Sequence, residues 1–341
     1  MATLDQTQHE DAGPQPVVLD VDSQSSDSDS TLGSSLASDT SSIRSSLYEH
    51  VEENGRTYHK YKSGQYYLPN DDIEQNRLDL QHILFNLTFD GKLALAPISK
   101  PQMVLDIGTG TGLWATDFGE PPPSENPAAI VIGTDLSAIQ PAMIPPNVRF
   151  EISDAEDEWT YTQKFDYIHG RALTICFKEP LKVFKSAFDN LVPGGYFEMQ
   201  DLYFRPHSDD GTLTGTALEK WNAKLAAGGA KMGKDWWCTP NYARWFQEAG
   251  FEAVVEKKFF WPGNTWPKGR KQKEMGMTML ANSMEGVEAI SLKMFTGLYG
   301  MSVEEVNEVV RDVKKDLCDK NIHAYYPLYV VYGRKPLDAL A

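Results

Sequence analysis

The hydropathy pattern contains short apolar runs that stop at polar or glycine-rich segments. Val104, Leu105 and Ile107 surround one acid, Asp106, and lead directly into three closely spaced glycines. A short apolar run of this kind is typical of a buried parallel strand. Glycines that follow such a strand let the backbone approach a ligand closely. The pattern therefore predicts a buried strand that ends in a glycine turn.

Further strands are predicted along the chain, separated by helical patterns and turns. They cover 129–137, 148–153, 165–171, the segment after the turn PGG at 193–195, an antiparallel-looking stretch at 251–261 and a last strand at 325–333. A helix over 179–192 places Leu181, Phe184, Phe188 and Leu191 on one face. Alternating strands and helices indicate an α/β fold with a parallel sheet.

Helical material is predicted before and after the core of this sheet. Residues 47–69 are rich in tyrosine and charge, and Asn70 or Asp71 would cap the helix that follows, which we interpret as a helical lid. His82 lies on the apolar face of that helix and is interpreted as a core residue. Helical periodicity at 213–232 and 271–319 indicates insertions at the mouth of the crevice, where an acceptor pocket forms.

Residues 1–46 differ from the rest of the chain. They are rich in Ser, Asp and Thr and contain no aromatic residue, so they cannot bury enough apolar surface to offset the entropy of ordering. We expect a disordered acidic tail there, followed by one domain over 47–341. A proline-rich loop is expected at 120–127.

Composition and charge exclude several function classes. The net charge of −16 argues against direct nucleic-acid binding, which rests on Lys and Arg neutralising phosphates. The three cysteines are far apart and lack C-x-x-C spacing, which argues against zinc or any other metal site and against a disulfide framework. No secretory signal and no apolar run long enough to span a membrane is found, so we expect a cytoplasmic protein.

The spacing of the glycines bears on the kind of ligand. A dinucleotide-binding turn has its third glycine five positions after the first, whereas here that position is Leu113 and the third glycine is Gly112. Asp106 would repel a pyrophosphate but can reach the polar end of an amino-acid-like ligand. The D-x-G-x-G-x-G turn resembles motif I of S-adenosylmethionine-dependent methyltransferases. NAD binding by a dehydrogenase stays open as an alternative.

Polar side chains follow the neighbouring strands. Asp135 ends the second strand and could bind a ribose, which NAD and S-adenosylmethionine share, or it could cap a helix. The third strand ends in Asp154, Ala155 and Glu156, and the fourth in His169, Gly170 and Arg171. Because the carboxyl ends of parallel strands meet at one edge of a sheet, we expect these residues to surround one ligand.

Several motifs together resemble the fungal LaeA-like methyltransferases. They are NGRTYHKY, YLPND, RLDLQH, LDIGTGTGLWA, TDLSAIQP, NLVPGGYFE and the closing IHAY and RKP, which extend over residues 48–336. The resemblance implies a class I, Rossmann-like, doubly wound sheet of about seven strands with the last one antiparallel. It also implies S-adenosylmethionine as cofactor. The cofactor residues expected on this basis are Asp106, Gly108, Thr109, Gly110, Gly112, Trp114, Asp135, Leu136, Asp154, Ala155, Glu156, His169 and Arg171.

Methyl transfer from a sulfonium depends mainly on holding the acceptor atom close to the methyl group and in line with it. A base is needed only if the acceptor atom carries a proton before the reaction. His169, Glu198 and His323 are the candidates for that base. We expect a small-molecule acceptor, methylated on O or N, in fungal secondary metabolism. Trp221, Trp236, Trp237, Trp261 and Trp266 suit an aromatic or apolar acceptor.

Two other functions stay open. The first is a nuclear regulator of secondary metabolism, acting as a protein methyltransferase or through protein partners and using the tail and the basic segment 266–273. The second is a cofactor-binding scaffold without transfer activity.

Overall fold

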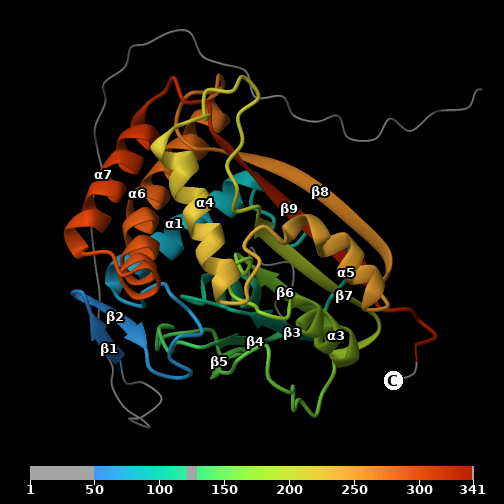
Figure 1. Ribbon diagram of the computed structural model, residues 1–341. Coiled ribbons are helices and arrows are strands. Elements are labelled where there is room, and N and C mark those ends of the chain that lie inside the picture. The colour runs from blue at the N-terminus through green and yellow to red at the C-terminus, as the bar shows by residue number, and fades with distance from the viewer. Residues whose placement is uncertain (1–49, 121–128, 340–341) are drawn as a thin grey trace, which may run out of the picture.

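Seven strands form one mixed sheet in the order β5, β4, β3, β6, β7, β9, β8 (Figure 1). The computed structural model describes residues 50–120 and 129–339. The strands are β3 (Met103–Ile107), β4 (Ile130–Asp135), β5 (Val148–Ile152), β6 (Phe165–Arg171), β7 (Leu191–Leu202), β8 (Glu252–Pro262) and β9 (Tyr325–Arg334). Strands β3 to β7 are parallel to one another, and β9 is antiparallel to both β7 and β8. The predicted α/β fold and the antiparallel last strand are thus confirmed.

The strand order reverses at β3. The chain runs from β3 to β4 and β5 on one side, and then returns to β6 and β7 on the other. Ligands of open α/β sheets bind outside the carboxyl ends of the strands at such a reversal. The glycine turn after β3 lies at this point.

The helices are α1 (Asp72–Thr88), α2 (Leu113–Gly119), α3 (Pro180–Asn190), α4 (Ala217–Lys231), α5 (Tyr242–Glu248), α6 (Arg270–Tyr299) and α7 (Val303–Cys318), with one 3₁₀ turn, Thr239–Asn241. Asp71 caps α1, since its carboxylate accepts a hydrogen bond from the backbone N–H of Glu74. Asp71 is one of the two predicted caps. The helix therefore begins where the sequence indicates.

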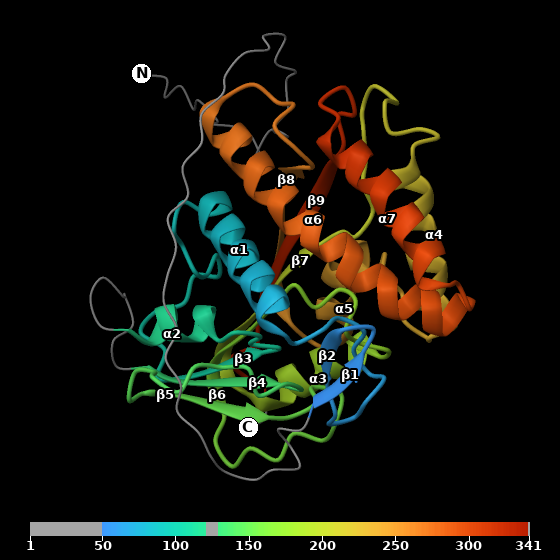
Figure 2. The same cartoon turned by 90° about the vertical axis from the view of Figure 1, so that its left-hand side faces the viewer.

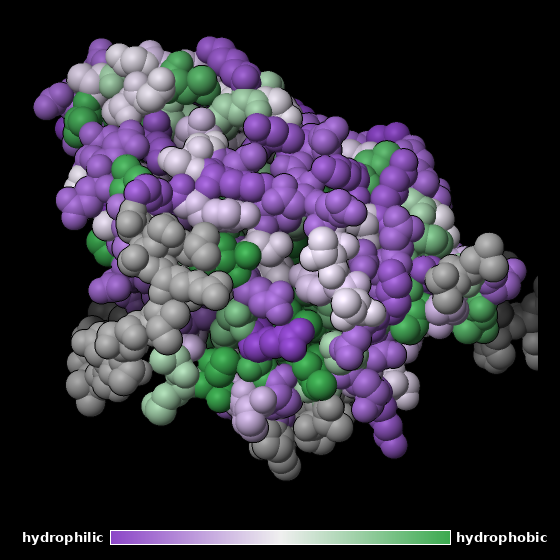
Figure 3. All heavy atoms as spheres, turned by 90° about the horizontal axis from the view of Figure 1, so that it is seen from below, coloured by the Kyte–Doolittle hydropathy of each residue, from purple (hydrophilic) through white to green (hydrophobic). Residues whose placement is uncertain are grey.

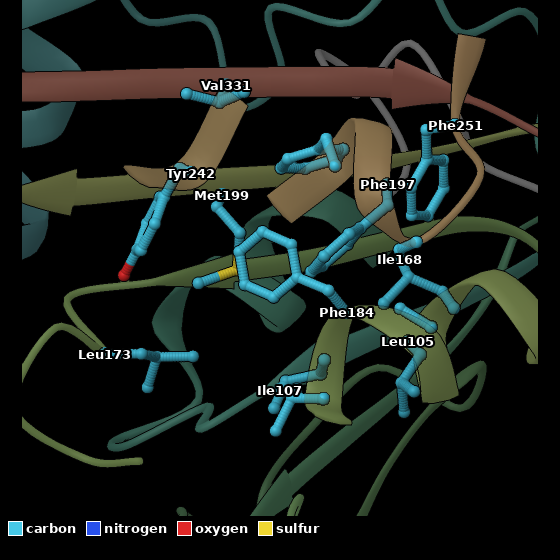
Figure 4. Close-up of a cluster of buried hydrophobic side chains, with 14 of the residues drawn as sticks. Leu105, Ile107, Ile168, Leu173, Phe184, Phe197, Met199, Tyr242, Phe251 and Val331 are labelled. Atoms are coloured by element: carbon cyan, nitrogen blue, oxygen red, sulfur yellow. The ribbon is translucent and has the colours of Figure 1, made fainter. Parts of the chain in front are cut away.

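Side chains alternate between the two faces of the sheet, as the strand period requires. Leu105 and Ile107 of β3 and Phe197 of β7 join the apolar cluster beneath α3 and α5 (Figure 4). Phe184 of α3 is fully buried there, with its ring 5.3 Å from those of Phe197 and Tyr242. Burying such a side chain contributes about 1.5–3 kcal/mol, so this face fixes α3 and α5 on the sheet.

The opposite face packs against α1, α2 and the first part of α6. Val104 and Val131 contact Trp114 and Phe118 of α2, while Leu84 and Phe85 of α1 join Met275 and Met279 of α6 against Leu328 of β9. Figure 2 shows α1 and α2 on this side, with α6 beside α1. This arrangement places α1 next to the glycine turn.

Helices α4, α6 and α7 occupy the two segments for which the sequence predicts helical insertions. They share an apolar cluster of their own, with Trp221 from α4, Ile290 from α6 and Val310 from α7 (Figure 2). The basic segment 266–273 runs into α6, which begins at Arg270. These helices form a cap beside the sheet.

A short hairpin precedes α1 and was not predicted. Strands β1 (His50–Glu53) and β2 (Arg56–His59) pair antiparallel across a turn in which Asn54 and Gly55 have φ of 53° and 74°. The predicted lid over 47–69 therefore contains strands and turns in its described part, and the helix begins only afterwards. The predicted tail, 1–46, and most of the loop expected at 120–127 lie outside the described residues.

The surface seen from below is largely polar, with apolar side chains in groups between polar ones (Figure 3). Across residues 50–120 and 129–339, no helix combines the length and the apolar character needed to cross a membrane.

Candidate functional site

The glycine turn brings its backbone to the carboxyl edge of the sheet. Gly108 and Gly110 both have positive φ, 63° and 58°, a conformation that favours glycine. A Cβ atom on Gly108 would lie 2.4 Å from Leu173, so this position has no room for a side chain. Gly110 faces α1, where a Cβ atom would lie 3.5 Å from Leu78. A long side chain at Gly110 would therefore fill the space between the turn and α1.

A cavity of about 1140 Å³ opens at this edge, and we name it the edge cavity. Its wall includes nine of the predicted cofactor residues: Gly108, Thr109, Gly110, Asp135, Leu136, Asp154, Ala155, Glu156 and Arg171. These residues come from the ends of four neighbouring strands. The ends of these strands therefore border one space, and their role around one ligand stays a prediction.

Two acids lie at the edge cavity. Asp135 accepts hydrogen bonds from the backbone N–H groups of Gly110 and Ser137, both at 2.9 Å, and burial raises its pKa. Asp154 lies 2.7 Å from Nζ of Lys62 and accepts a bond from the N–H of Glu156. Both carboxylates can accept hydrogen bonds from the hydroxyl and amino groups of a nucleoside.

The segment 60–70, which precedes α1 and which we name the lid segment, covers part of the edge cavity, since Gln65, Tyr66, Pro69 and Asn70 line it. Lys62 bridges Asp154 and Asp157, and Lys234 donates to the backbone carbonyls of Gln65 and Cys176. Lys234 is buried, and desolvation lowers its pKa. Two cations therefore hold this segment over the cavity.

Arg171 is a half-buried cation on the wall of the edge cavity. One of its Nη atoms contacts Nδ1 of His82, and its guanidinium lies 5.0 Å above the ring of Phe85. Because arginine only donates, Nδ1 of His82 accepts, and Nε2 carries the proton that faces Asp117 at 2.9 Å. Burial lowers the pKa of Arg171 to about 10, so it stays charged at neutral pH.

Among the described residues, Arg171 forms no direct ion pair with a carboxylate, although the charges of Asp106 and Asp117 act on it and partly offset the lowering of its pKa by burial. Its side chain lines the edge cavity, so a ligand carboxylate there could accept a hydrogen bond from its guanidinium. His82, interpreted from the sequence as a core residue, is indeed buried, but it also lines the cavity and orients Arg171.

Four predicted cofactor residues do not line the edge cavity: Asp106, Gly112, Trp114 and His169. Asp106 and His169 point to the face covered by α2, where Oδ1 of Asp106 and Nδ1 of His169 are 2.7 Å apart. The ring of His169 stacks on Trp114 with 3.8 Å between centroids, and Gly112 is the N-cap of α2. These residues support the glycine turn, since Thr109 also donates to Asp106.

None of the three candidate bases lines the edge cavity or the second cavity described below. His169 and Glu198 are both 0% exposed, so neither can touch an acceptor directly. Glu198 accepts hydrogen bonds from the N–H groups of Leu95 and Ala96 and so anchors the loop before β3. His323 lies in the cap, with Nδ1 facing Asp210.

A second cavity of about 850 Å³, which we name the cap cavity, lies between α1, α6 and the ends of β6 and β7. Its wall is mostly apolar and includes Leu68, Leu202, Phe204, Trp221, Val287 and Ile290. Of the five tryptophans expected near an acceptor pocket, Trp221 lies on this wall. Four residues line both cavities: Tyr66, Leu78, Gln81 and Ala172.

Polar groups in the cap cavity are mostly engaged with one another. Arg77 forms a buried ion pair with Glu74 at 2.7 Å and donates to Asn282 at 2.9 Å. Asp201 accepts hydrogen bonds from the N–H of Leu173 and from the hydroxyl of Tyr242, and burial raises its pKa to about 6. Asp201 therefore fixes the loop after β6, which lines both cavities.

Sequence reasoning missed several wall residues. Glu74 and Leu173 carry no motif of their own, and Gln81 lies in the motif RLDLQH without a predicted role, although Glu74, Leu78 and Gln81 recur at helical spacing on one face of α1. That periodicity was the available signal for a ligand-facing side of the helix. Within the described ranges, no three His, Cys, Asp or Glu side chains lie close enough together to hold a metal.

Several known proteins that are similar to this chain are methyltransferases by name. Residues 80–256 match the family model described as a methyltransferase domain. The chain is 36% identical to methyltransferase pytC of Aspergillus terreus over 95% of this chain and 97% of that protein. It is 39% identical to the probable methyltransferase tdiE of Emericella nidulans, over 78% of this chain and 83% of that one.

A relative with a regulatory name is also similar. The secondary metabolism regulator laeA of Aspergillus fumigatus is 33% identical over 89% of this chain and 82% of that protein. The motif resemblance, the strand order and the edge cavity all agree with these matches. The chain therefore belongs to the fungal LaeA-like family of S-adenosylmethionine-dependent methyltransferases.

Proposed function

We propose that this protein transfers a methyl group from S-adenosylmethionine to an oxygen or nitrogen atom of a small, largely apolar molecule in fungal secondary metabolism. One observation carries the proposal: a cavity at the sheet edge, lined by the glycine turn, Asp135 and Asp154, adjoins a second cavity lined by aromatic and branched side chains, and four residues belong to both walls. Each cavity suits one of the two reactants. The identities with pytC and tdiE support the link to secondary metabolism.

The residues of the edge cavity fit S-adenosylmethionine. Asp135 would accept hydrogen bonds from the ribose hydroxyls, and Asp154 from the adenine amino group. Arg171 would bind the carboxylate, since it lines the cavity and forms no direct ion pair with a carboxylate of the described residues. The glycine turn leaves the room that the ligand needs, because a side chain at Gly110 would extend toward Leu78.

The bound sulfonium supplies an activated methyl group, so the protein has to align the acceptor and keep water out. Holding two reactants in line at about 3 Å can supply roughly 7–11 kcal/mol of the barrier. The lid segment and α1 surround the junction of the two cavities and would provide this alignment. His169, Glu198 and His323 do not enter this proposal as bases, because none of them lines a cavity wall.

The test is transfer of isotopically labelled methyl from S-adenosylmethionine to small molecules of a fungal culture extract. We expect the wild-type protein to label at least one extractable molecule and Gly110→Arg to abolish the labelling by filling the edge cavity. Gly215→Arg is the matched control, since Gly215 also has positive φ but has open space around it. Equal labelling by wild type and Gly110→Arg would contradict the proposed site, and labelling confined to protein would contradict the small-molecule acceptor.

A second candidate is a regulator that methylates protein or acts through protein partners, with a nuclear location. Its support is the 33% identity with laeA, and another relative of that identity, from Emericella nidulans, is named protein-methionine methyltransferase laeA. Labelling of a co-purified protein in the same experiment would favour this candidate.

A further inference from the structure

The junction of the two cavities is bordered by four residues. Tyr66 comes from the lid segment, Leu78 and Gln81 from α1, and Ala172 from the loop after β6. A methyl donor in the edge cavity and an acceptor in the cap cavity can meet only at this junction. Leu78 and Ala172 are apolar. Tyr66 and Gln81 are therefore the polar side chains that border the place of reaction.

Neither of these polar side chains is engaged. Within the described part of the chain, the hydroxyl of Tyr66 and the amide of Gln81 form no hydrogen bond. Their polar neighbours do: Glu74 and Arg77 pair with each other, and Arg77 also donates to Asn282. Half-buried polar groups without partners, at the border of two adjoining cavities, are poised to bind a ligand.

The lid contacts hold Tyr66 in this place. Lys234 donates to the carbonyl of Gln65, the residue before Tyr66, and Lys62 ties the start of the segment to Asp154. Burial raises the pKa of Tyr66 well above its usual value of 10, so its hydroxyl keeps its proton at neutral pH. Tyr66 is therefore available as a donor and not as a base.

We propose, on the basis of the function proposed above, that Tyr66 and Gln81 position the acceptor atom, and that this atom is the hydroxyl oxygen of a phenol or enol on an apolar ring system. A hydroxyl oxygen has two lone pairs and one proton. One lone pair accepts from Tyr66, the proton is donated to Oε1 of Gln81, and the second lone pair is free to attack. An aromatic amine has a single lone pair, which cannot both accept from Tyr66 and attack.

The step balances without an added reagent. The acceptor oxygen forms a bond to the methyl carbon while the carbon–sulfur bond breaks and leaves its electron pair on sulfur. The hydroxyl proton is hydrogen-bonded to Gln81 during the attack and is released to bulk water when the ether leaves the site. The products are a methyl ether, S-adenosylhomocysteine and a proton.

The cap cavity has walls suited to such a skeleton. Trp221, Phe204 and Ile290 provide aromatic and branched surface against which a flat ring system can pack. Burial of an apolar ring system there supplies binding energy, while Tyr66 and Gln81 set its orientation. The polar atom of the acceptor is thereby directed at the junction.

Two probes of equal shape test the inference: 2-naphthol and 2-naphthylamine, titrated by their fluorescence against the protein with S-adenosylhomocysteine present. The wild type is expected to bind naphthol about 5- to 10-fold more tightly than naphthylamine, the ratio that one hydrogen bond supplies. Tyr66→Phe should bring the two dissociation constants together. Gln81→Leu should weaken both probes and preserve the ratio, since both can donate to Gln81.

The matched control is Tyr67→Phe, which removes the same hydroxyl from the adjacent residue, a tyrosine that packs in the cap cluster and lines neither cavity. It should behave as wild type. Equal binding of the two probes by the wild type, or an unchanged ratio in Tyr66→Phe, would overturn the inference. Binding of S-adenosylhomocysteine but of neither probe would overturn the apolar acceptor class. Failure of the wild type to bind S-adenosylhomocysteine would instead contradict the proposed function, and this inference with it.

Discussion

At the scale of single residues, strand alternation decides which acids face the ligand. Asp106 and His169 lie opposite each other in the register of β3 and β6, one position before Ile107 and Gly170. Their side chains therefore point to the face covered by α2, where Trp114 packs on His169. The sequence identified the strand ends correctly, and Asp135 and Asp154 lie on the cavity wall. The sequence could not show which residues near those ends point to the face covered by α2 and so do not line the edge cavity.

Arg171 provides the sharpest prediction at this scale. Arg171→Met should weaken binding of S-adenosylmethionine by about 10-fold, because a charge-assisted hydrogen bond to the carboxylate is lost. Decarboxylated S-adenosylmethionine lacks that group, so its affinity should change little. Isothermal titration of both compounds measures the ratio of the two affinities.

The control for this variant is Arg149→Met, which alters an exposed arginine on β5. It should leave both affinities unchanged. An equal loss of affinity for both compounds in Arg171→Met would place the carboxylate elsewhere in the cavity.

At the scale of elements, the sequence predicted most helices and strands but not how the lid is held. The cap at Asp71 follows from local chemistry. The hairpin β1–β2 also had a local signal, the Asn54–Gly55 turn, but its strands are charged and lack the apolar alternation that marks a strand. The contact between Lys234 and Gln65 joins residues 169 positions apart and has no local signal at all.

Lys234 therefore gives the prediction for the lid. Lys234→Met removes the donor to the carbonyls of Gln65 and Cys176. Amide hydrogens of residues 63–68 should exchange about 10-fold faster, the effect of roughly one lost hydrogen bond, while the global free energy of unfolding changes little. Hydrogen exchange measured by mass spectrometry reads this segment directly.

Lys231→Met, at the exposed last residue of α4 and three positions before Lys234, is the comparison and should leave the exchange unchanged. Unchanged exchange in Lys234→Met as well would mean that the remaining contacts, above all that of Lys62 with Asp154, hold the lid segment without it.

At the scale of the whole molecule, the two cavities are assembled from distant parts of the chain. In the cap cavity Arg77 of α1 meets Asn282 of α6, 205 positions away, and in the edge cavity the lid segment meets four strand ends. Figure 2 shows α1 and α6 side by side. The sheet and its binding edge could be predicted because each strand carries its own pattern. The composition of the walls could not, because it depends on which helices pack together.

The most direct test of the account is isothermal titration of the full chain with S-adenosylmethionine and, separately, with NADH. We predict that the wild type binds S-adenosylmethionine at one site and does not bind NADH, and that Gly110→Arg loses this binding while Gly215→Arg retains it. Binding of NADH, or wild-type affinity for S-adenosylmethionine in Gly110→Arg, would contradict the assignment of the edge cavity.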